Sequence, residues 1–148
     1  MDADPNTGQR TKIVRTARET ATAAVGKPYL PGGRDTTGFD CSGFVTYVYE
    51  KVFPHYQHLN TSGIENNPAF KETKTPQAGD LIFFPSGTNP YEVKKQNNRV
   101  YPAHVGIVLD DGHWIGSQTS TGVAQVPMSH PWWAGRAKKF FRYAYIGE

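Results

Sequence analysis

The amino-acid sequence predicts a single α+β domain in which two helices come first and an antiparallel sheet follows. Two segments in the first third of the chain carry apolar side chains at helical spacing, and short apolar runs separated by turn residues occupy positions 81–145. Helices followed by strands are typical of an α+β domain with a helix packed on the sheet. At 148 residues the chain can build one hydrophobic core, so we expect one domain, 1–148, with residues 1–8 flexible.

The first helix is predicted from about Gln9 to Val25. Ile13 and Ala17 recur on one side of this segment, whereas charged and hydroxyl side chains occupy the other side. Gly26 and Pro28 follow directly and end the helix, because neither residue favours its continuation.

The second helix is predicted to begin at Cys41 and to end near Phe53. Asp40 precedes it and is a favourable N-cap. Its apolar stripe, at i, i+3, i+4, i+7, i+8 and i+11, consists of Cys41, Phe44, Val45, Val48, Tyr49 and Val52. Unpaired backbone N–H groups and the positive end of the helix dipole favour a thiolate over a thiol at this first helical position.

The rest of the chain is predicted to form short strands joined by turns and loops. Segment 55–79 is expected to be a loop with one short helical turn, and 85–103 a long loop of the kind that is usually functional or mobile. The turn Asp110-Asp111-Gly112 between two apolar runs indicates a hairpin. The predicted strands are Leu81–Phe84, Val105–Leu109, His113–Ile115, Val123–Val126 and Phe141–Tyr145.

Charge and composition disfavour several classes of function. The net charge is only +3 and the basic residues are dispersed, so we expect no nucleic-acid surface. No apolar run reaches the roughly 18 residues of a membrane span, and residues 1–6 lack the apolar core of a secretory signal. His55 and His58 have no neighbouring ligands that would complete a metal set, and no phosphate-binding loop occurs. We therefore expect neither a metal nor a cofactor.

Cys41 is the only cysteine and the candidate nucleophile. A lone cysteine cannot form an intramolecular disulfide, and a buried structural thiol is the alternative interpretation. A cysteine nucleophile needs a base, which is usually histidine. Among the five histidines, His104 directly precedes the predicted strand 105–109, so a rigid element would hold its ring. An ordinary residue at a strand edge is the other interpretation of His104.

Four ordered motifs resemble the NlpC/P60 family of cell-wall peptidases. They are Gly26-x-Pro28-Tyr29-x-x-Gly32-Gly33, Gly38-Phe39-Asp40-Cys41-Ser42-Gly43-Phe44-Val45, Gly79-Asp80-Leu81-Ile82-Phe83-Phe84 and His104-Val105-Gly106-Ile107-Val108. The resemblance extends from about Gly26 to Val126. It implies a papain-like fold, with the cysteine at a helix N-terminus packed on an antiparallel sheet. It also implies a hydrolase that cuts amide bonds in peptidoglycan stem peptides, commonly beside a γ-linked D-glutamate or a diaminopimelate.

The resemblance also assigns roles to individual residues. It makes Cys41 the nucleophile and His104 the general base of an acyl transfer that passes through an acyl-enzyme. Tyr29 matches the family tyrosine that faces the thiol and helps to bind the substrate or the oxyanion. Asp40 and Ser42 flank the thiol, where backbone N–H groups would stabilise the oxyanion.

The third catalytic position departs from the family pattern. An alignment anchored on His104 places Gly116 where the family usually has a polar residue, often histidine. Gln118 lies two residues further and hence on the same strand face, so its amide could occupy the space that glycine leaves. We predict Gln118 as the orienting residue. Ser117, His113, or a water or backbone carbonyl remain the alternatives, and Ser117 is also a candidate for substrate binding.

The absence of a visible signal and of wall-binding repeats bears on where the protein is made and where it acts. A small basic catalytic domain of this kind resembles the type VI secretion amidase effectors, which are toxins delivered into a rival's periplasm and neutralised at home by a periplasmic immunity protein. We therefore expect a protein that is made in the cytoplasm and acts on the cell wall of a target cell. The alternatives are a housekeeping or phage-associated wall hydrolase, a non-catalytic wall-binding domain and a transacylase. The sequence does not indicate which peptide bond is cut.

Overall fold

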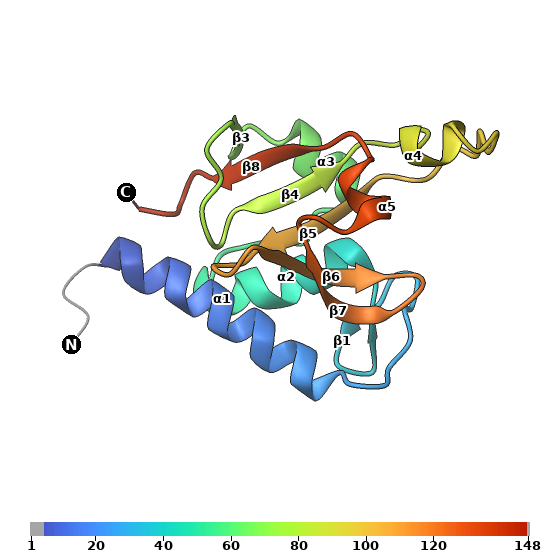
Figure 1. The fold of residues 1–148 in the computed structure, drawn as a ribbon. Helices are drawn as coiled ribbons and strands as arrows, with labels where there is room; N and C mark the ends of the chain where they lie inside the picture. Colours follow the sequence, from blue (N-terminus) through green and yellow to red (C-terminus); the bar gives the residue numbers. More distant parts are fainter. Residues whose placement is uncertain (1–4, 148) are drawn as a thin grey trace.

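The fold consists of N-terminal helices and an antiparallel sheet (Figure 1). The computed structural model describes residues 5–147. The helices are α1 (Pro5–Ala23), α2 (Cys41–Val52), α3 (Thr61–Asn66), α4 (Pro90–Val93) and α5 (Pro131–Ala134). The strands are β1 (Arg34–Asp35), β2 (Gly38–Phe39), β3 (Phe70–Thr73), β4 (Leu81–Phe84), β5 (His104–Val108), β6 (His113–Gln118), β7 (Gly122–Pro127) and β8 (Lys139–Tyr143).

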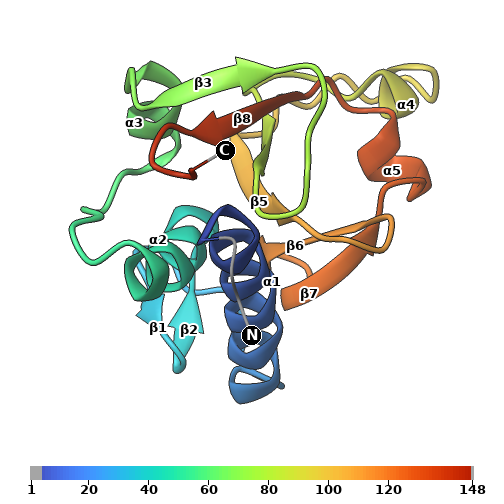
Figure 2. The same cartoon turned by 90° about the vertical axis from the view of Figure 1, so that its left-hand side faces the viewer.

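The main sheet has six strands in the order β3-β8-β4-β5-β6-β7, and every neighbouring pair is antiparallel. Strands β4 to β7 form the predicted meander, whereas β8 inserts between β3 and β4. The short strands β1 and β2 pair with each other just before α2. Helices α1 and α2 lie side by side next to the sheet (Figure 2).

Both faces of the sheet are covered, which explains the uninterrupted apolar run of β4. Leu81 and Phe83 belong to the main core, together with Ile13 of α1 and Val45 of α2. The alternate β4 residues point to the opposite face and belong to a second cluster with Trp114, where Trp133 of α5 packs on them. A strand that is buried on both faces is expected to be continuously hydrophobic rather than alternating.

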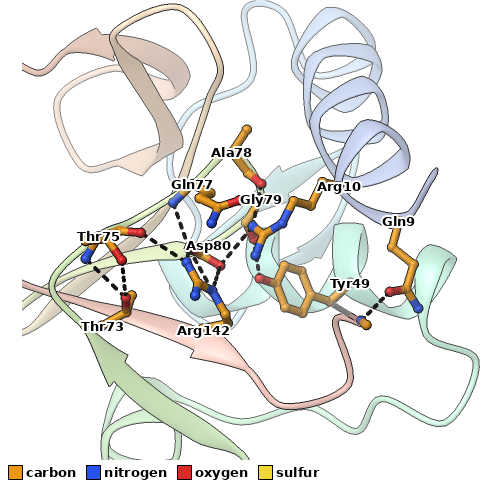
Figure 3. Close-up of polar contacts among 11 residues, drawn as sticks. Gln9, Arg10, Tyr49, Thr73, Thr75, Gln77, Ala78, Gly79, Asp80 and Arg142 are labelled. Carbon is orange, nitrogen blue, oxygen red and sulfur yellow. Dashed lines mark hydrogen bonds and ion pairs between the residues drawn. The ribbon is translucent and has the colours of Figure 1, made fainter. Parts of the chain in front are cut away.

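A buried carboxylate ties α1, β4 and β8 together (Figure 3). Asp80 is fully buried and accepts hydrogen bonds from Arg10 on α1 (3.1 Å) and from Arg142 on β8 (2.9 Å). Beside it, the Tyr49 hydroxyl of α2 donates to the Gly79 carbonyl at 2.5 Å. The Gly79-Asp80 motif therefore anchors the helices to the sheet, because a buried charge must be paired.

Several predicted boundaries were wrong in ways that have a physical cause. Helix α1 starts at Pro5 instead of Gln9, so residues 5–8 of the segment expected to be flexible are helical, and residues 1–4 lie outside the described residues. The short strand β3 in the predicted loop 55–79 is an edge strand with exposed residues, which lacks the apolar pattern of a central strand. The last strand runs over 139–143, because pairing with β3 and β4 sets its register.

Candidate active site

A pocket of about 580 Å³ lies where the start of α2 meets the sheet, and it contains the predicted cysteine and histidine. Cys41, His104 and Gln118 all line it, and so does Tyr29 from the loop that follows α1. The other lining residues come from the 101–103 segment, from the β6–β7 turn, from β7 and from the α5 region, and include Tyr101, Thr121, His130, Trp132, Trp133 and Arg136. Pockets of this size commonly hold small ligands or peptide segments.

The N-cap fixes the position of Cys41. The Asp40 carboxylate accepts from the backbone N–H of Gly43 at 2.6 Å and from that of Gly32 at 3.0 Å, so one side chain joins the helix start to the preceding loop. The Ser42 hydroxyl donates to the same carboxylate at 3.4 Å. Asp40 and Ser42, both predicted as substrate or oxyanion residues, are thus engaged in building the turn that presents the thiol.

His104 is held by Gln118 at hydrogen-bond distance, with 3.1 Å between Nε2 and Oε1. The orientation of the Gln118 amide follows from its second contact. The Thr121 hydroxyl donates to the Gly122 carbonyl at 2.8 Å, so it accepts from the Gln118 amide N–H at 3.2 Å. The amide oxygen therefore faces the imidazole and accepts from Nε2–H. In the neutral ring, Nδ1 is then left unprotonated and can act as a base.

Aromatic rings surround the imidazole of His104. The ring centroids of Trp133, Trp114 and Phe84 lie 5.1, 5.8 and 6.1 Å from it. The pKa of His104 is lowered to about 4: burial is the main cause, the hydrogen bond to Gln118 opposes it, and the charge of Arg136 acts in the same direction as burial. The environment thus keeps this histidine neutral.

The surroundings of Cys41 favour the neutral thiol. Burial raises the pKa of Cys41, and the nearby Asp40 carboxylate adds to the effect, whereas backbone N–H groups such as that of Val105 lower it without prevailing. With the pKa of His104 lowered and that of Cys41 raised, the free protein favours a thiol and a neutral imidazole in the same pocket. This differs from the thiolate that the helix start alone predicts, because burial penalises both charged forms.

Tyr29 lines the same pocket as Cys41. Burial raises the pKa of the Tyr29 hydroxyl, and the negative charges of Cys41 and Asp40 raise it further. The hydroxyl therefore stays protonated and available as a hydrogen-bond donor in the pocket.

Two alternatives for the orienting residue are engaged elsewhere. The Ser117 hydroxyl is fully buried and donates to the Phe39 carbonyl at 2.7 Å, which ties β6 to the strand before Cys41. His113 lies at the opposite end of β6 from Gln118, where its ring is partly exposed and contacts Asp111. The hydrogen bonds of both residues go elsewhere, whereas Gln118 bonds to His104, so the geometry favours Gln118 as its partner.

Comparisons with known proteins agree with this architecture. The sequence model of the NlpC/P60 family matches residues 26–142, which is most of the chain. The chain belongs to the NlpC/P60 family. It is 32% identical over 123 residues to a protein named "Probable peptidoglycan endopeptidase LytE" from Bacillus subtilis, covering 81% of this chain and 32% of that protein. It is 31% identical to a "Probable endopeptidase" from Haemophilus influenzae, covering 74% of this chain and 62% of that one. This chain therefore spans a third to three fifths of these relatives.

Solved structures of the family share the fold. The NlpC/P60 domain of the peptidoglycan hydrolase SagA superposes with a TM-score of 0.60 at 27% identity, over 88% of this chain and 96% of that one. An NlpC/P60 protein from Bacillus cereus gives a TM-score of 0.65 at 26% identity, over 91% of this chain and 40% of the other. The predicted papain-like α+β fold is confirmed.

Gly116 explains how this NlpC/P60 domain accommodates a glutamine beside the histidine. A Cβ atom at Gly116 would lie 2.8 Å from Gln118 Oε1 and 3.3 Å from the Val105 carbonyl oxygen. Such contacts are too close for a side chain while the amide stays in place. The glycine thus leaves room for the amide that contacts His104.

Some site residues were not predicted from the sequence. Thr121 fixes the Gln118 amide, and Arg136 lines the pocket from beyond α5. For Trp133 the sequence leaves two alternatives, a groove wall or a residue packed on the sheet, and in the structure it both packs on the sheet and lines the pocket. A turn threonine and an arginine in a basic cluster carry no local pattern that marks them, because distant segments bring them to the site.

Neither a metal cluster nor a membrane helix is found among the described residues. Within residues 5–147 no three His, Cys, Asp or Glu side chains gather in a way that could hold a metal ion. No described helix is both long and apolar enough to cross a bilayer.

Proposed function

We propose that this domain is a cysteine peptidase that hydrolyses an amide bond in peptidoglycan stem or cross-linking peptides. The observation that carries the proposal is the hydrogen bond from His104 to Gln118 in the pocket that also holds Cys41. A thiol at a helix start, a neutral imidazole and an acceptor that fixes its tautomer are the parts that nucleophilic cysteine catalysis requires. The names of the relatives support peptidoglycan as the substrate class.

The proposed first step is acylation. Nδ1 of His104 takes the Cys41 proton as the sulfur attacks the carbonyl carbon of the scissile amide. Backbone N–H groups at the start of α2 and the Tyr29 hydroxyl stabilise the oxyanion. The imidazolium then donates its proton to the leaving amine as the C–N bond breaks, which leaves a thioester on Cys41.

Deacylation reverses the proton transfers. His104 removes a proton from water, the hydroxide oxygen attacks the thioester carbonyl, and the C–S bond breaks. The sulfur recovers its proton from the imidazolium, and the product leaves as a carboxylic acid that ionises. Gln118 accepts from Nε2–H throughout and favours the imidazolium in both steps, since a hydrogen bond to a charged donor is stronger than one to a neutral donor.

Digestion of purified sacculi tests the proposal. The wild-type protein is expected to release muropeptides whose masses identify the cut bond, while Cys41→Ala releases none. Identical products from both proteins would refute hydrolysis and leave a wall-binding domain. Covalent adducts to an added amine, in place of hydrolysis products, would instead support a transacylase.

Delivery by type VI secretion and neutralisation by an immunity protein stay predictions from the sequence. Directing the domain to the periplasm of a Gram-negative host by an added signal peptide should lyse the cells, whereas the Cys41→Ala variant should not. Growth unaffected by either protein would contradict a toxin role.

A further inference from the structure

Arg136 places a buried positive charge in the active-site pocket. The residue is only 3% exposed and lines the same pocket as Cys41 and His104. Its Nη2 atom donates to the backbone carbonyls of Pro85 (3.2 Å) and Pro102. Among residues 5–147, no carboxylate lies within ion-pair distance of it, and neither Nε nor Nη1 has a hydrogen-bond partner. Three of the five N–H donors of the guanidinium thus have no acceptor.

The other buried charge cluster shows how this fold normally satisfies such groups. Arg10 and Arg142 meet at the buried carboxylate of Asp80 (Figure 3). A buried cation without an anion is costly, and native proteins rarely leave a buried donor such as Nε of Arg136 without an acceptor. Arg136 departs from this pattern at the place where a substrate would bind.

The surroundings of Arg136 stabilise a cation without satisfying its donors. Its guanidinium carbon lies 5.6 Å from the ring centroid of Phe84, 5.8 Å from that of Trp133 and 5.9 Å from those of Tyr101 and Trp132. Ring faces attract a cation but provide no strong acceptor. The two hydrogen bonds from Nη2 join both ends of the 85–102 segment to the chain just after α5. This structural role explains the position of Nη2 but not the unsatisfied Nε and Nη1 donors. Because the Nε and Nη1 donors have no hydrogen-bond acceptor among the described residues, they point to a ligand as their partner.

The proposed substrate class carries a matching group. A γ-linked glutamate keeps its α-carboxylate free beside the peptide chain, and diaminopimelate keeps a further carboxylate. Arginine binds carboxylates well because its fork of donors is fixed and permanently charged. Aromatic walls would strengthen such a pair by excluding water.

We propose that Arg136 binds a free carboxylate of the stem peptide and makes this site selective for acidic over amidated peptides. The inference rests on the proposed function for its ligand, but binding can be measured without hydrolysis. Burial lowers the pKa of Arg136, whereas the charges of Tyr101 and Cys41, which line the same pocket, raise it.

The test uses the full chain with Cys41→Ala and synthetic L-Ala–γ-D-Glu–diaminopimelate peptides. One peptide has both carboxylates free, a second has the glutamate α-carboxylate amidated, and a third has the diaminopimelate side-chain carboxylate amidated. Calorimetry is expected to give roughly tenfold to hundredfold weaker binding for one amidated peptide, the range of a hydrogen bond to a charged group. The amide that weakens binding identifies the carboxylate. Adding Arg136→Met should abolish the preference, whereas Arg99→Met, an exposed arginine on the long loop, should keep it.

Equal binding of all three peptides would overturn the inference, and so would an acid preference that survives in a folded Arg136→Met protein. If that variant does not fold, the Nε–H resonance of Arg136 in the Cys41→Ala protein, assigned by its loss in Arg136→Lys, decides. This resonance should move downfield when the peptide with free carboxylates is added, and it should not move when the peptide with the recognised carboxylate amidated is added. A resonance that moves with neither peptide would overturn the inference. Failure of the wild-type protein to cut sacculi refutes the hydrolase instead, whatever these binding results show.

Discussion

Replacing Gln118 with leucine tests whether this residue orients His104, the proposed general base. The substitution leaves Nε2–H of His104 without the acceptor that lies 3.1 Å away, while it keeps a side chain of similar size in a buried position. The bond should matter more in the proposed reaction than at rest, because the imidazole would become an imidazolium in each proposed proton transfer. A hydrogen bond to a charged group contributes about 1.5–3 kcal/mol, so kcat/KM should fall roughly tenfold to hundredfold.

The assay is kcat/KM on a synthetic stem peptide from acid to neutral pH, with urea unfolding of each variant. Stability should fall by about 1–3 kcal/mol, the cost of leaving a buried neutral donor without an acceptor. Gln57→Leu, at an exposed loop position, is the matched control and should change neither quantity. Gln118→Glu should retain activity but move the acid limb of the rate profile to higher pH, because a carboxylate raises the pKa of the imidazole. An unchanged kcat/KM in folded Gln118→Leu would refute the orienting role.

Three further outcomes follow from the described contacts. Gly116→Ala should reduce kcat/KM by displacing the Gln118 amide, whose oxygen would lie 2.8 Å from the new Cβ. The double variant with Gln118→Leu should have a kcat/KM only slightly below that of Gln118→Leu alone, and additive losses would contradict this reasoning. Asp80→Ala should lower the free energy of unfolding by about 3 kcal/mol, measured in urea, because it removes the anion from a buried ion-pair network; exposed Asp111→Ala is the control. Burial lowers the pKa of His104 from 6.5 to about 4, so the unfolded chain takes up this proton first and the free energy of unfolding should fall by up to about 3 kcal/mol between these pH values. His104→Gln should show less of this fall, and an equal fall in both proteins would contradict the lowered pKa.

The elements with strong local signals could be predicted from the sequence. The stripe from Cys41 to Val52 and the Asp40 cap define α2 within a residue of its observed ends. The apolar run Leu81–Phe84 and the Asp110–Gly112 turn likewise mark strands that the structure contains. In each case the residues that determine the element lie within it, so the pattern is readable without knowing the fold.

Elements whose stability depends on distant partners could not be predicted. Strand β3 is an edge strand that exists through pairing with β8, which follows some 70 residues later. The single turn of α5 begins at a proline and is held by contacts of Trp133 with the sheet. The charge states in the pocket could not be predicted from the sequence either, because the pKa of His104 depends on its burial among rings from three separate segments.

The turn between β6 and β7 lies against the loop that carries Tyr29. Gly122 there has φ of +68°, and a Cβ atom at this position would lie only 2.3 Å from the Lys27 carbonyl oxygen. The backbone of the segment leading to Tyr29 therefore touches the turn whose threonine sets the amide of Gln118. A peptide that displaced this loop on entry would therefore disturb the close approach of Lys27 to Gly122, which directly follows the threonine that bonds the Gln118 amide.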